Sequence, residues 1–301
     1  MKRKRILLYI LLLLLPCLLL LVRPDTTEEP QGYTVELYRN GQLETLPLRD
    51  YLWGVLAGEM PASYPMEALK AQVVASYSYL RFRTDAGDAL GHPGDICADP
   101  NHCKAYLSPA EAAAKWGKDW LDASRGKLAE AVEAVLGEVL CHDGKPANTV
   151  FHAISGGRTE SSEAVWGGAL PYLISVDSHW DAAAAGYASE VRLSLGEFCE
   201  KLGVTDPTLG GVTLSAGGSV DSLSVGGKTF TGRELRSLFG LRSTRFTLTL
   251  GEEAVFAVKG YGHQVGMSQY GASVLAAKGY SYADILAYYY PNTLLTENYF
   301  E

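Results

Sequence analysis

The chain has 301 residues, with 26 basic and 34 acidic side chains and a net charge of −8. Hydrophobic residues make up 47% and charged residues 20%, which excludes a disordered chain and fits a folded protein with a buried core. The first 23 residues hold five basic and no acidic side chains, so the remainder carries a net charge of −13. A body this acidic lacks the basic surface that nucleic-acid binding requires.

The N-terminal sequence predicts a membrane anchor. Residues 2–5 are all basic, and residues 6–22 form an apolar run interrupted only by Pro16 and Cys17. As a helix this run spans about 26 Å, the short end of a bilayer core. No small-residue cleavage site follows it, so residues 1–23 are predicted to be an uncleaved signal anchor with the body outside the cytoplasm. The alternative is a lipoprotein box ending at Cys17.

The predicted elements change from helical to strand-rich along the chain. Residues 33–44 predict a hairpin with a type I′ turn at Asn40 and Gly41. Capping and periodicity predict helices at residues 48–60, 65–84, 108 onward, 128–136, 231 onward, 272–278 and 284–290. Short alternating runs predict strands at residues 138–141, 149–154, 191–195, 212–214, 219–225 and 246–250. The fold class is therefore α+β, with a helical first half, a strand-rich second half and a cleft between them.

Glu59 is the first candidate for chemistry. It follows three apolar residues of the first predicted helix on the same helical face, namely Leu52, Val55 and Leu56. Burial disfavours a carboxylate and raises its pKa, which lets a glutamic acid donate a proton near neutral pH. The alternative is a last-turn glutamate that bends out to water beside Pro61.

The loop at residues 92–103 concentrates possible metal ligands, which are His92, Cys97, His102 and Cys103. Zn²⁺ takes thiolate and imidazole ligands, but this spacing matches no zinc-finger pattern. A Cys97–Cys103 disulfide is an equally good interpretation for an exported chain. The residues alone leave both interpretations open.

Residues 155–168 combine small hydroxyl residues with paired glycines and Trp166. This composition indicates a backbone that approaches a ligand, with Trp166 as a surface for a sugar ring. The segment lacks the Gly-x-Ser-x-Gly pattern, so no nucleophile elbow is implied. The alternative is an ordinary polar loop.

Residues 260–272 place His263, Ser268 and Gln269 among four glycines, just before a predicted helix. No lysine lies in the turn, so no phosphate-binding motif matches. The alternative is a structural histidine held by hydrogen bonds.

Together these segments resemble the stage II sporulation protein D (SpoIID) family, peptidoglycan lytic transglycosylases of spore-forming bacteria. The resemblance covers about residues 33–292, nearly the whole exported body. Several separate motifs occur in the family's order, at residues 51–61, 67–72, 103–106, 155–159, 165–172 and 262–272.

The resemblance implies cleavage between N-acetylmuramic acid (MurNAc) and N-acetylglucosamine (GlcNAc) without water, with Glu59 as the catalytic acid. Ordinary glycosidases need a second carboxylate as nucleophile or base. A lytic transglycosylase uses the 6-hydroxyl of MurNAc instead and leaves a 1,6-anhydroMurNAc end. The sequence around Glu59 offers no acidic partner at close spacing, in agreement with this chemistry.

The resemblance also implies which residues bind. The substrate-binding residues would be Lys70, Gln72, Ser155, Gly156, Gly157, Thr159, Trp166, His263, Ser268 and Gln269. Some family members carry zinc on this loop, which favours zinc over a disulfide here, although the chemistry requires no cofactor. The metal ligands would be His92, Cys97 and Cys103, with His102 as a rival.

Two positions depart from the family pattern. The family often has a small residue, Arg and Thr after Gln72, whereas residues 75–79 here are Ala, Ser, Tyr, Ser and Tyr. The glycine usual after His263 is Gln264. Both departures bring the affinity for substrate into doubt and leave the reaction class unchanged.

The implied organisation is an anchor (1–23), a linker (24–32), a SpoIID-like catalytic domain of one or two subdomains (33–292) and a tail (293–301). Family analogy places the body between mother cell and forespore during engulfment, anchored through residues 6–22. Its partners would be glycan strands and stage II sporulation proteins P, an amidase, and M, a scaffold. Two alternatives are a non-catalytic activator of a cell-wall amidase, which would tolerate loss of Glu59, and a zinc hydrolase, which a chelator would inactivate.

Overall fold

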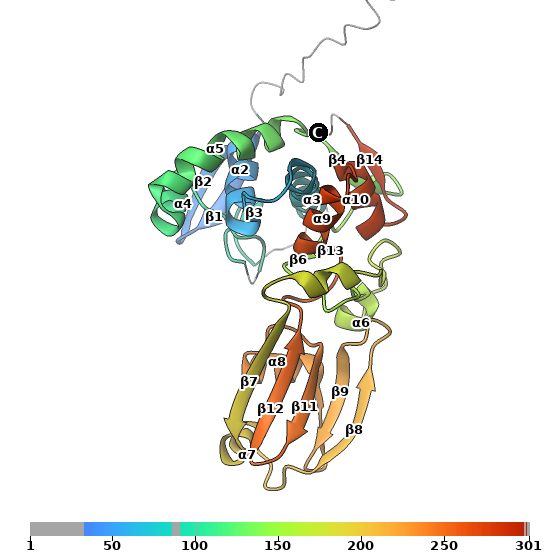
Figure 1. Ribbon diagram of the computed structural model, residues 1–301. Helices are drawn as coiled ribbons and strands as arrows, with labels where there is room; N and C mark the ends of the chain where they lie inside the picture. The colour runs from blue at the N-terminus through green and yellow to red at the C-terminus, as the bar shows by residue number, and fades with distance from the viewer. Residues whose placement is uncertain (1–32, 86–90, 101, 298, 300–301) are drawn as a thin grey trace, which may run out of the picture. The chain divides into compact units, whose positions relative to one another are not determined.

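The computed structural model describes residues 33–85, 91–100, 102–297 and 299 (Figure 1). The predicted anchor and linker lie outside the described residues. Within the described residues, no helix is both long enough and apolar enough to cross a membrane.

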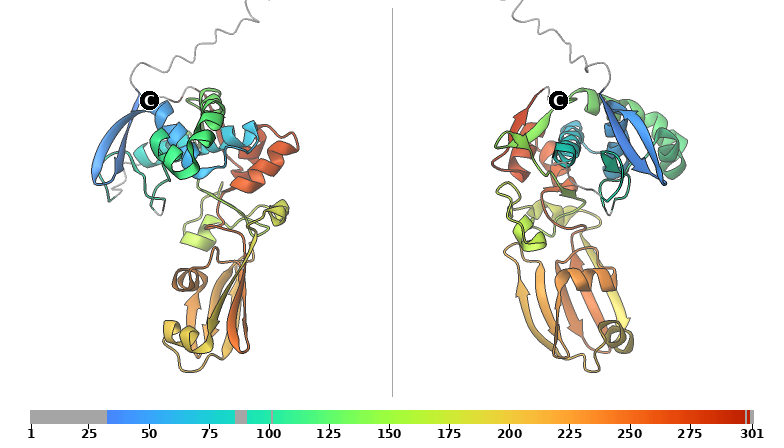
Figure 2. Two further views of the ribbon diagram at one scale, coloured as in Figure 1. Left: turned by 60° about the vertical axis from the view of Figure 1, so that its left-hand side comes forward. Right: turned by 180° about the vertical axis from the view of Figure 1, so that it is seen from behind.

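The first part of the chain is mainly helical and begins with a hairpin (Figures 1 and 2). Asn40 and Gly41 both have positive φ, which confirms the predicted type I′ turn. The elements are β1 (Thr34–Arg39), β2 (Gln42–Pro47), α2 (Leu48–Glu59), α3 (Met66–Asp85), β3 (Ile96–Cys97), α4 (Pro109–Trp116) and α5 (Lys118–Glu133).

The boundary between α4 and α5 differs from the prediction. The predicted capping box of Ser108 and Glu111 opens α4, which confirms that start. The helix predicted at residues 128–136 is wrong in its bounds, because α5 begins at Lys118 and ends at Glu133. Charged residues and Gly126 dilute the apolar pattern in the first turns of α5, so its periodicity is visible only toward the end.

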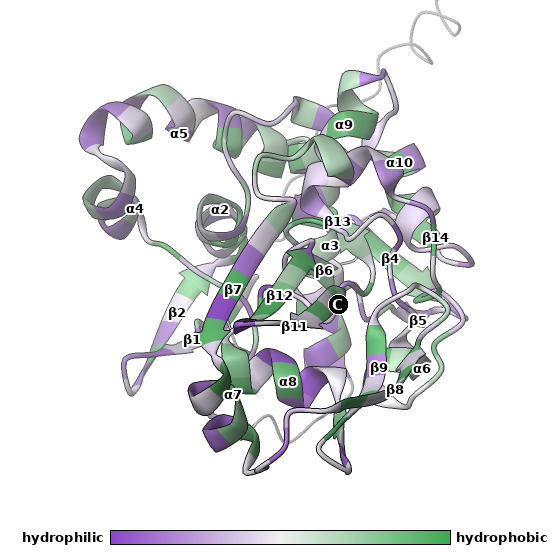
Figure 3. Cartoon of the chain, turned by 60° about the horizontal axis from the view of Figure 1, so that its bottom comes forward, coloured by the Kyte–Doolittle hydropathy of each residue, from purple (hydrophilic) through white to green (hydrophobic). Residues whose placement is uncertain are grey.

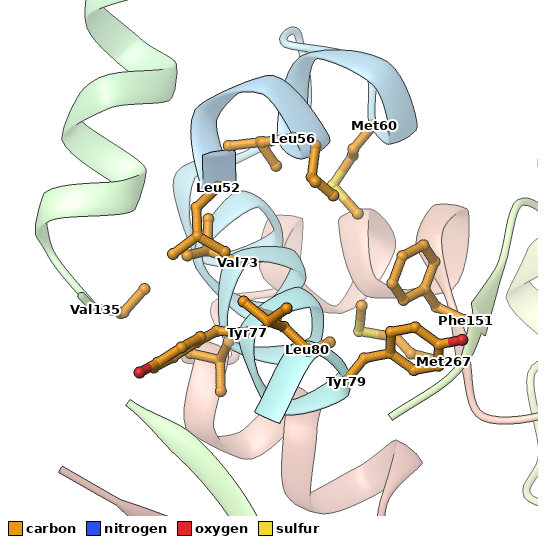
Figure 4. Packing of buried hydrophobic residues seen from close by; sticks show 14 of the residues in the cluster. Leu52, Leu56, Met60, Val73, Tyr77, Tyr79, Leu80, Val135, Phe151 and Met267 are labelled. Carbon is orange, nitrogen blue, oxygen red and sulfur yellow. The ribbon is translucent and has the colours of Figure 1, made fainter. Parts of the chain in front are cut away.

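The helix α3 lies at the centre of the larger hydrophobic core, in contact with α2, α5, α9 and α10. Figure 4 shows side chains of α2 and α3 packed together, with the strand pair β6–β13 contributing from the other side. The labelled residues are Leu52, Leu56, Met60, Val73, Tyr77, Tyr79, Leu80, Val135, Phe151 and Met267. A helix buried on several faces gives a weak amphipathic signal, so the sequence pattern identified only part of this core.

The second part of the chain is rich in short strands, and the α+β class is confirmed. The elements are β4 (Val139–His142), β5 (Lys145–Pro146), β6 (Phe151–His152), α6 (Ser162–Trp166), the 3₁₀ helix η1 (His179–Ala183), β7 (Ala188–Ser194), α7 (Leu195–Leu202), β8 (Leu209–Leu214), β9 (Val220–Val225), β10 (Lys228–Thr231), α8 (Gly232–Phe239), β11 (Phe246–Leu250), β12 (Glu253–Lys259), β13 (Met267–Ser268), α9 (Gln269–Ala277), α10 (Tyr282–Tyr289) and β14 (Leu294–Thr296).

Two antiparallel sheets, β11-β12-β7 and β10-β9-β8, share a second hydrophobic core with α7 and α8. Figure 3 shows the alternation of hydrophilic and hydrophobic residues along β7 that lets one face of a sheet be buried. The aromatic centre of this core is Phe198, Phe239, Phe246 and Phe256. The predicted capping box at Thr231 and Glu234 opens α8, which confirms it.

Strand pairing departs from the prediction at one hairpin. The turn at Asp143 and Gly144 does join two strands, but β4 pairs with β5 and not with residues 149–154. Phe151 and His152 pair in parallel with Met267 and Ser268 instead. After this parallel pair the chain continues from β13 into α9, which packs on α3 in the helical part.

The packing of α2 yields a test of the fold. A Cβ added to Gly54 would lie 2.2 Å from a ring carbon of Tyr106. Alanine usually stabilises a helix interior over glycine by about 1 kcal/mol. We expect Gly54→Ala to lower the thermal unfolding temperature instead, because the methyl group pushes Tyr106 away from α2.

The matched control is Gly126→Ala in α5, where an added Cβ meets no atom within 4 Å. This variant should be neutral or more stable. Circular dichroism melts of both variants check the prediction, and equal shifts for the two would contradict it.

Candidate active site and metal-ligand cluster

Glu59 is the last residue of α2, which ends before Pro61 because proline cannot continue the helix. The carboxylate Oε1 accepts a hydrogen bond from the backbone N–H of Ala105 at 2.7 Å. The side chain is partly exposed, while the apolar residues that share its helical face are buried: Leu52, Val55 and Leu56. The predicted helical face is confirmed, and it brings an acid to the edge of the core.

Burial raises the pKa of Glu59, and the neighbouring groups lower it in part. The strongest of these is the Lys104 ammonium, followed by the Ala105 N–H, the Gln269 side chain and the Lys115 ammonium. A raised pKa keeps a glutamic acid protonated closer to neutral pH, as a general acid requires. The same neighbours stabilise the carboxylate that remains after the proton is given away.

Lys104 was not predicted as a functional residue. Its ammonium lies 4.1 Å from the ring centroid of Tyr79 and 3.7 Å from that of Phe151. Burial lowers the pKa of Lys104 to about 8, although the Glu59 carboxylate opposes the shift. The Lys104 side chain therefore remains mostly protonated at neutral pH. The only sequence signal was its position directly after Cys103, inside a family motif.

Two glutamines connect Glu59 to the helical core. The side-chain amide of Gln269 donates to the Gln72 carbonyl oxygen at 3.2 Å, and the Gln72 amide donates to the Ser76 hydroxyl at 3.1 Å. Gln72 is fully buried in α3, and Gln269 is the first residue of α9. This chain of bonds fixes the Gln269 amide beside the Glu59 carboxylate.

Asp181 forms a buried hydrogen-bond network that joins the two polar loops, residues 155–168 and 260–272. Its carboxylate accepts from the Ser155 N–H at 2.7 Å, from the Ser178 hydroxyl at 2.6 Å and from the Ser268 hydroxyl. Ser155 and Ser268, predicted as substrate contacts, are fully buried in this network. Sequence reasoning missed Asp181, because a single aspartate followed by four alanines matches no motif.

Gln264, the residue after His263, has a positive φ of 71° and a fully buried side chain. Its amide nitrogen donates to the Ile154 carbonyl at 3.0 Å, and its Oε1 accepts from the Gly156 N–H at 2.5 Å. Gly156 is itself close-packed, since an added Cβ would lie 2.2 Å from the Arg245 side chain. Gln264 therefore joins the two polar loops and faces away from solvent.

Trp166 and His263 lie next to each other, with ring centroids 5.3 Å apart. Trp166 ends α6 and is 45% exposed. Burial lowers the pKa of His263 well below its usual value, and the neighbouring His152 adds to the effect. His263 is therefore neutral, and its Nδ1 accepts a hydrogen bond from the Val265 N–H at 3.1 Å. Both residues border a cavity of about 450 Å³ that strand residues complete.

The remaining predicted contacts make hydrogen bonds, ion pairs or turns within the fold. Lys70 pairs with Glu67 at 2.8 Å and lies over the Tyr282 ring. Thr159 is fully buried, and its hydroxyl oxygen accepts from the Val176 N–H at 2.8 Å. Gly157 has a positive φ of 108°, which favours glycine at this turn.

The ligand-rich loop brings its four candidate ligands together. The ligand atoms of His92, Cys97, His102 and Cys103 all lie within 4.8 Å of one another. His102 Nδ1 is 3.4 Å from each of the two sulfur atoms, and His92 Nε2 is 3.4 Å from the Cys103 sulfur. Both thiols are free. The predicted ligands His92, Cys97 and Cys103 are thus joined by His102, which was considered a rival.

Comparison with known proteins identifies the family of the chain. Residues 39–142, which contain Glu59 and the four ligands, match the family described as stage II sporulation protein (SpoIID). The chain is 35% identical to stage II sporulation protein D of Bacillus amyloliquefaciens over 281 residues, covering 91% of this chain and 81% of that protein. The identity to the Bacillus subtilis (strain 168) protein is 35% over 272 residues, covering 88% and 79%.

The chain belongs to the stage II sporulation protein D family. It is also 30% identical to the "Amidase enhancer" of Bacillus subtilis over 306 aligned positions, which cover 81% of this chain and 40% of that longer protein. Sequence similarity to this chain therefore extends to proteins whose names refer to different roles.

The Asp181 network yields a pH-dependent prediction. Burial raises the pKa of Asp181 from 3.8 to about 6. The folded state therefore binds this proton more tightly than the unfolded state does. The resulting contribution to the free energy of unfolding is fully present below pH 3.8 and is lost as pH rises through 6. Tyr289, which bonds Ser178, keeps its proton throughout because burial raises its pKa.

We expect Asp181→Asn, which is neutral at every pH, to gain stability relative to the parent chain as pH rises. The difference in unfolding free energy should shift by on the order of 3 kcal/mol between about pH 3.5 and about pH 7. Urea denaturation of both chains across this range measures it. Parallel stability curves would show that the carboxyl group does not titrate as described.

Proposed function

We propose that this SpoIID-family protein is a lytic transglycosylase that cleaves the MurNAc–GlcNAc bond of peptidoglycan. The observation that supports this is Glu59, a partly buried glutamic acid whose pKa is raised by burial. Among the described residues, the neighbours that act most strongly on it are two ammonium groups and two hydrogen-bond donors, Lys104, Lys115, the Ala105 N–H and Gln269, and no second carboxylate is among these four. This arrangement suits a reaction that uses one carboxyl group twice.

In the proposed reaction Glu59 first protonates the glycosidic oxygen, and the bond between that oxygen and C1 of MurNAc breaks. The resulting carboxylate then removes the proton of the MurNAc 6-hydroxyl, whose oxygen attacks C1. The products are a 1,6-anhydroMurNAc end and a free GlcNAc hydroxyl, and Glu59 is protonated again. Lys104, the Ala105 N–H and Gln269 stabilise the carboxylate between the two steps.

The sugar-binding residues in this proposal are Trp166 and His263. The indole of Trp166 is exposed, so it can stack against the apolar face of a sugar ring. Because His263 is neutral, it binds by hydrogen bonding and not by charge. The neighbouring cavity of about 450 Å³ has room for the rest of a sugar unit.

We expect Glu59→Gln to lose about 10²-fold or more of the cleavage rate, the usual scale for a missing general acid. Mass spectrometry of digested glycan strands should show 1,6-anhydroMurNAc ends with the parent chain. The control is Glu130→Gln, on the exposed surface of α5, which should keep the parent rate. Reducing ends in place of anhydro ends would mean hydrolysis and would reject the transglycosylase.

The similarity to an amidase enhancer favours a second candidate function, that of a non-catalytic activator. An activator would stimulate a cell-wall amidase equally well with Glu59→Gln, and the parent chain would release no anhydro ends. The two functions are therefore separated by the same variant. Anchoring by residues 1–23 and action beside stage II sporulation proteins P and M remain predictions from the sequence.

We also propose that the cluster of His92, Cys97, His102 and Cys103 binds zinc. Around a tetrahedral Zn²⁺ with S and N ligands, neighbouring ligand atoms are about 3.5 Å apart, given the usual bond lengths. The three sulfur–nitrogen distances of 3.4 Å fit this geometry, and all four ligand atoms lie within 4.8 Å of one another. Four protein ligands make a closed, structural site, and when bound the ion would supply a rigid crosslink directly before Lys104.

Protein purified without added metal should contain about one zinc per chain, by elemental analysis. Cys97→Ser should lose the metal, whereas Cys199→Ser, on α7 and outside the cluster, should keep it. Counting reactive thiols before and after a chelator should reveal two additional thiols when zinc leaves. Metal-free protein with Cys97 and Cys103 linked in a peptide map would replace the zinc site with a disulfide.

A further inference from the structure

The connection between α4 and α5 carries an exposed aromatic surface. Trp116 ends α4, Trp120 lies in the first turn of α5, and Gly117 between them has a positive φ of 94° that favours glycine. The two ring centroids are 6.1 Å apart, and the Lys115 ammonium lies 4.5 Å from the Trp116 ring centroid. We call Lys115, Trp116 and Trp120 the elbow platform.

Packing and capping interactions hold the elbow platform in place. Trp116 is 47% exposed, whereas Trp120 packs against the helical core. The start of α4 is fixed by its capping box, and Glu111 of that box also pairs with Arg39 at 2.7 Å. A pre-organised side chain loses little conformational freedom when a ligand binds. An exposed indole on such a support presents an apolar face that can stack on a ligand ring.

The platform is connected to the proposed acid through the segment that leads into α4. Glu59 accepts its hydrogen bond from Ala105, and the segment that follows Ala105 leads directly into α4. The Lys115 ammonium lowers the pKa of Glu59 through its charge. The helix α4 contacts α2, the helix that carries Glu59 (Figure 1). The exposed Trp116 therefore ends a helix that packs on the one bearing the proposed acid.

We propose that the elbow platform is a second sugar-binding subsite, which binds a glycan strand in addition to the Trp166 side. This rests on the proposed function and extends it to the substrate class, which is a strand several sugar units long. A pyranose ring stacks on the Trp116 indole, and Lys115 faces the carboxylate groups that peptidoglycan carries. A fragment that spans only the bond at Glu59 and the Trp166 side gains nothing from the platform.

A tryptophan next to lysines is also typical of a protein surface that touches phospholipid headgroups. The glycan is favoured here because the platform is connected to the proposed acid, which must meet the sugar strand during cleavage. Binding to lipid is therefore an outcome that the test must separate.

The test uses the full chain and its Trp116→Ala variant, with glycan strands of many repeats and with a tetrasaccharide. We expect KM for long strands to rise about tenfold, with kcat unchanged, and KM for the tetrasaccharide to stay the same. Trp116→Tyr should restore most of the affinity, because it keeps an aromatic face. Leu214→Ala, which removes a 59% exposed apolar side chain from β8, is the control and should change neither constant.

A binding measurement keeps the platform testable if the parent chain proves not to cleave. In the Glu59→Gln background, co-sedimentation with insoluble peptidoglycan should weaken about tenfold when Trp116→Ala is added. Unchanged binding and unchanged KM for long strands would overturn the platform. Weaker binding of Trp116→Ala to phosphatidylglycerol–phosphatidylcholine vesicles, with peptidoglycan binding unchanged, would overturn it in favour of a membrane surface.

Discussion

The hydrogen bond from the Ala105 N–H to the Glu59 carboxylate joins the two segments on which the site depends. It ties the end of α2 to the chain that leaves the ligand-rich loop, and so fixes the position of Lys104 between them. Tyr106 packs against Gly54 in the same stretch, and the Leu107 N–H donates to the Gly54 carbonyl at 3.0 Å. The Ala105 N–H and the Gln269 amide together therefore orient the proposed acid.

This arrangement places the Lys104 ammonium beside Glu59, although the chain as a whole has a net negative charge. Lys104 is held over two aromatic rings, which compensate in part for its removal from water. Its nearness to Glu59 stabilises both groups when they are charged, and burial acts against both. The balance leaves the pKa of Glu59 raised and the lysine mostly protonated, as a carboxyl group that gives and regains a proton in one turnover requires.

Sequence reasoning predicted the features that depend on local pattern. Glu59 was found from helical spacing, the helix starts at Ser108 and Thr231 from capping, and the first hairpin from its Asn-Gly turn. It did not predict features that arise from contacts distant in sequence. Ser155 and Ser268 look like ligand-binding hydroxyls until Asp181 is seen to bind both, across 26 and 87 residues of separation. The pairing of β6 with β13 is equally long-range.

Gln264 has a consequence for how this loop tolerates mutation. Its side chain accepts from the buried Gly156 N–H and shares the Ile154 carbonyl with the Tyr261 N–H. Glycine at position 264 would ease the backbone, which is left-handed at this residue, but would remove the acceptor of the Gly156 N–H. Such a change is therefore tolerable only with a compensating change in the 154–156 loop.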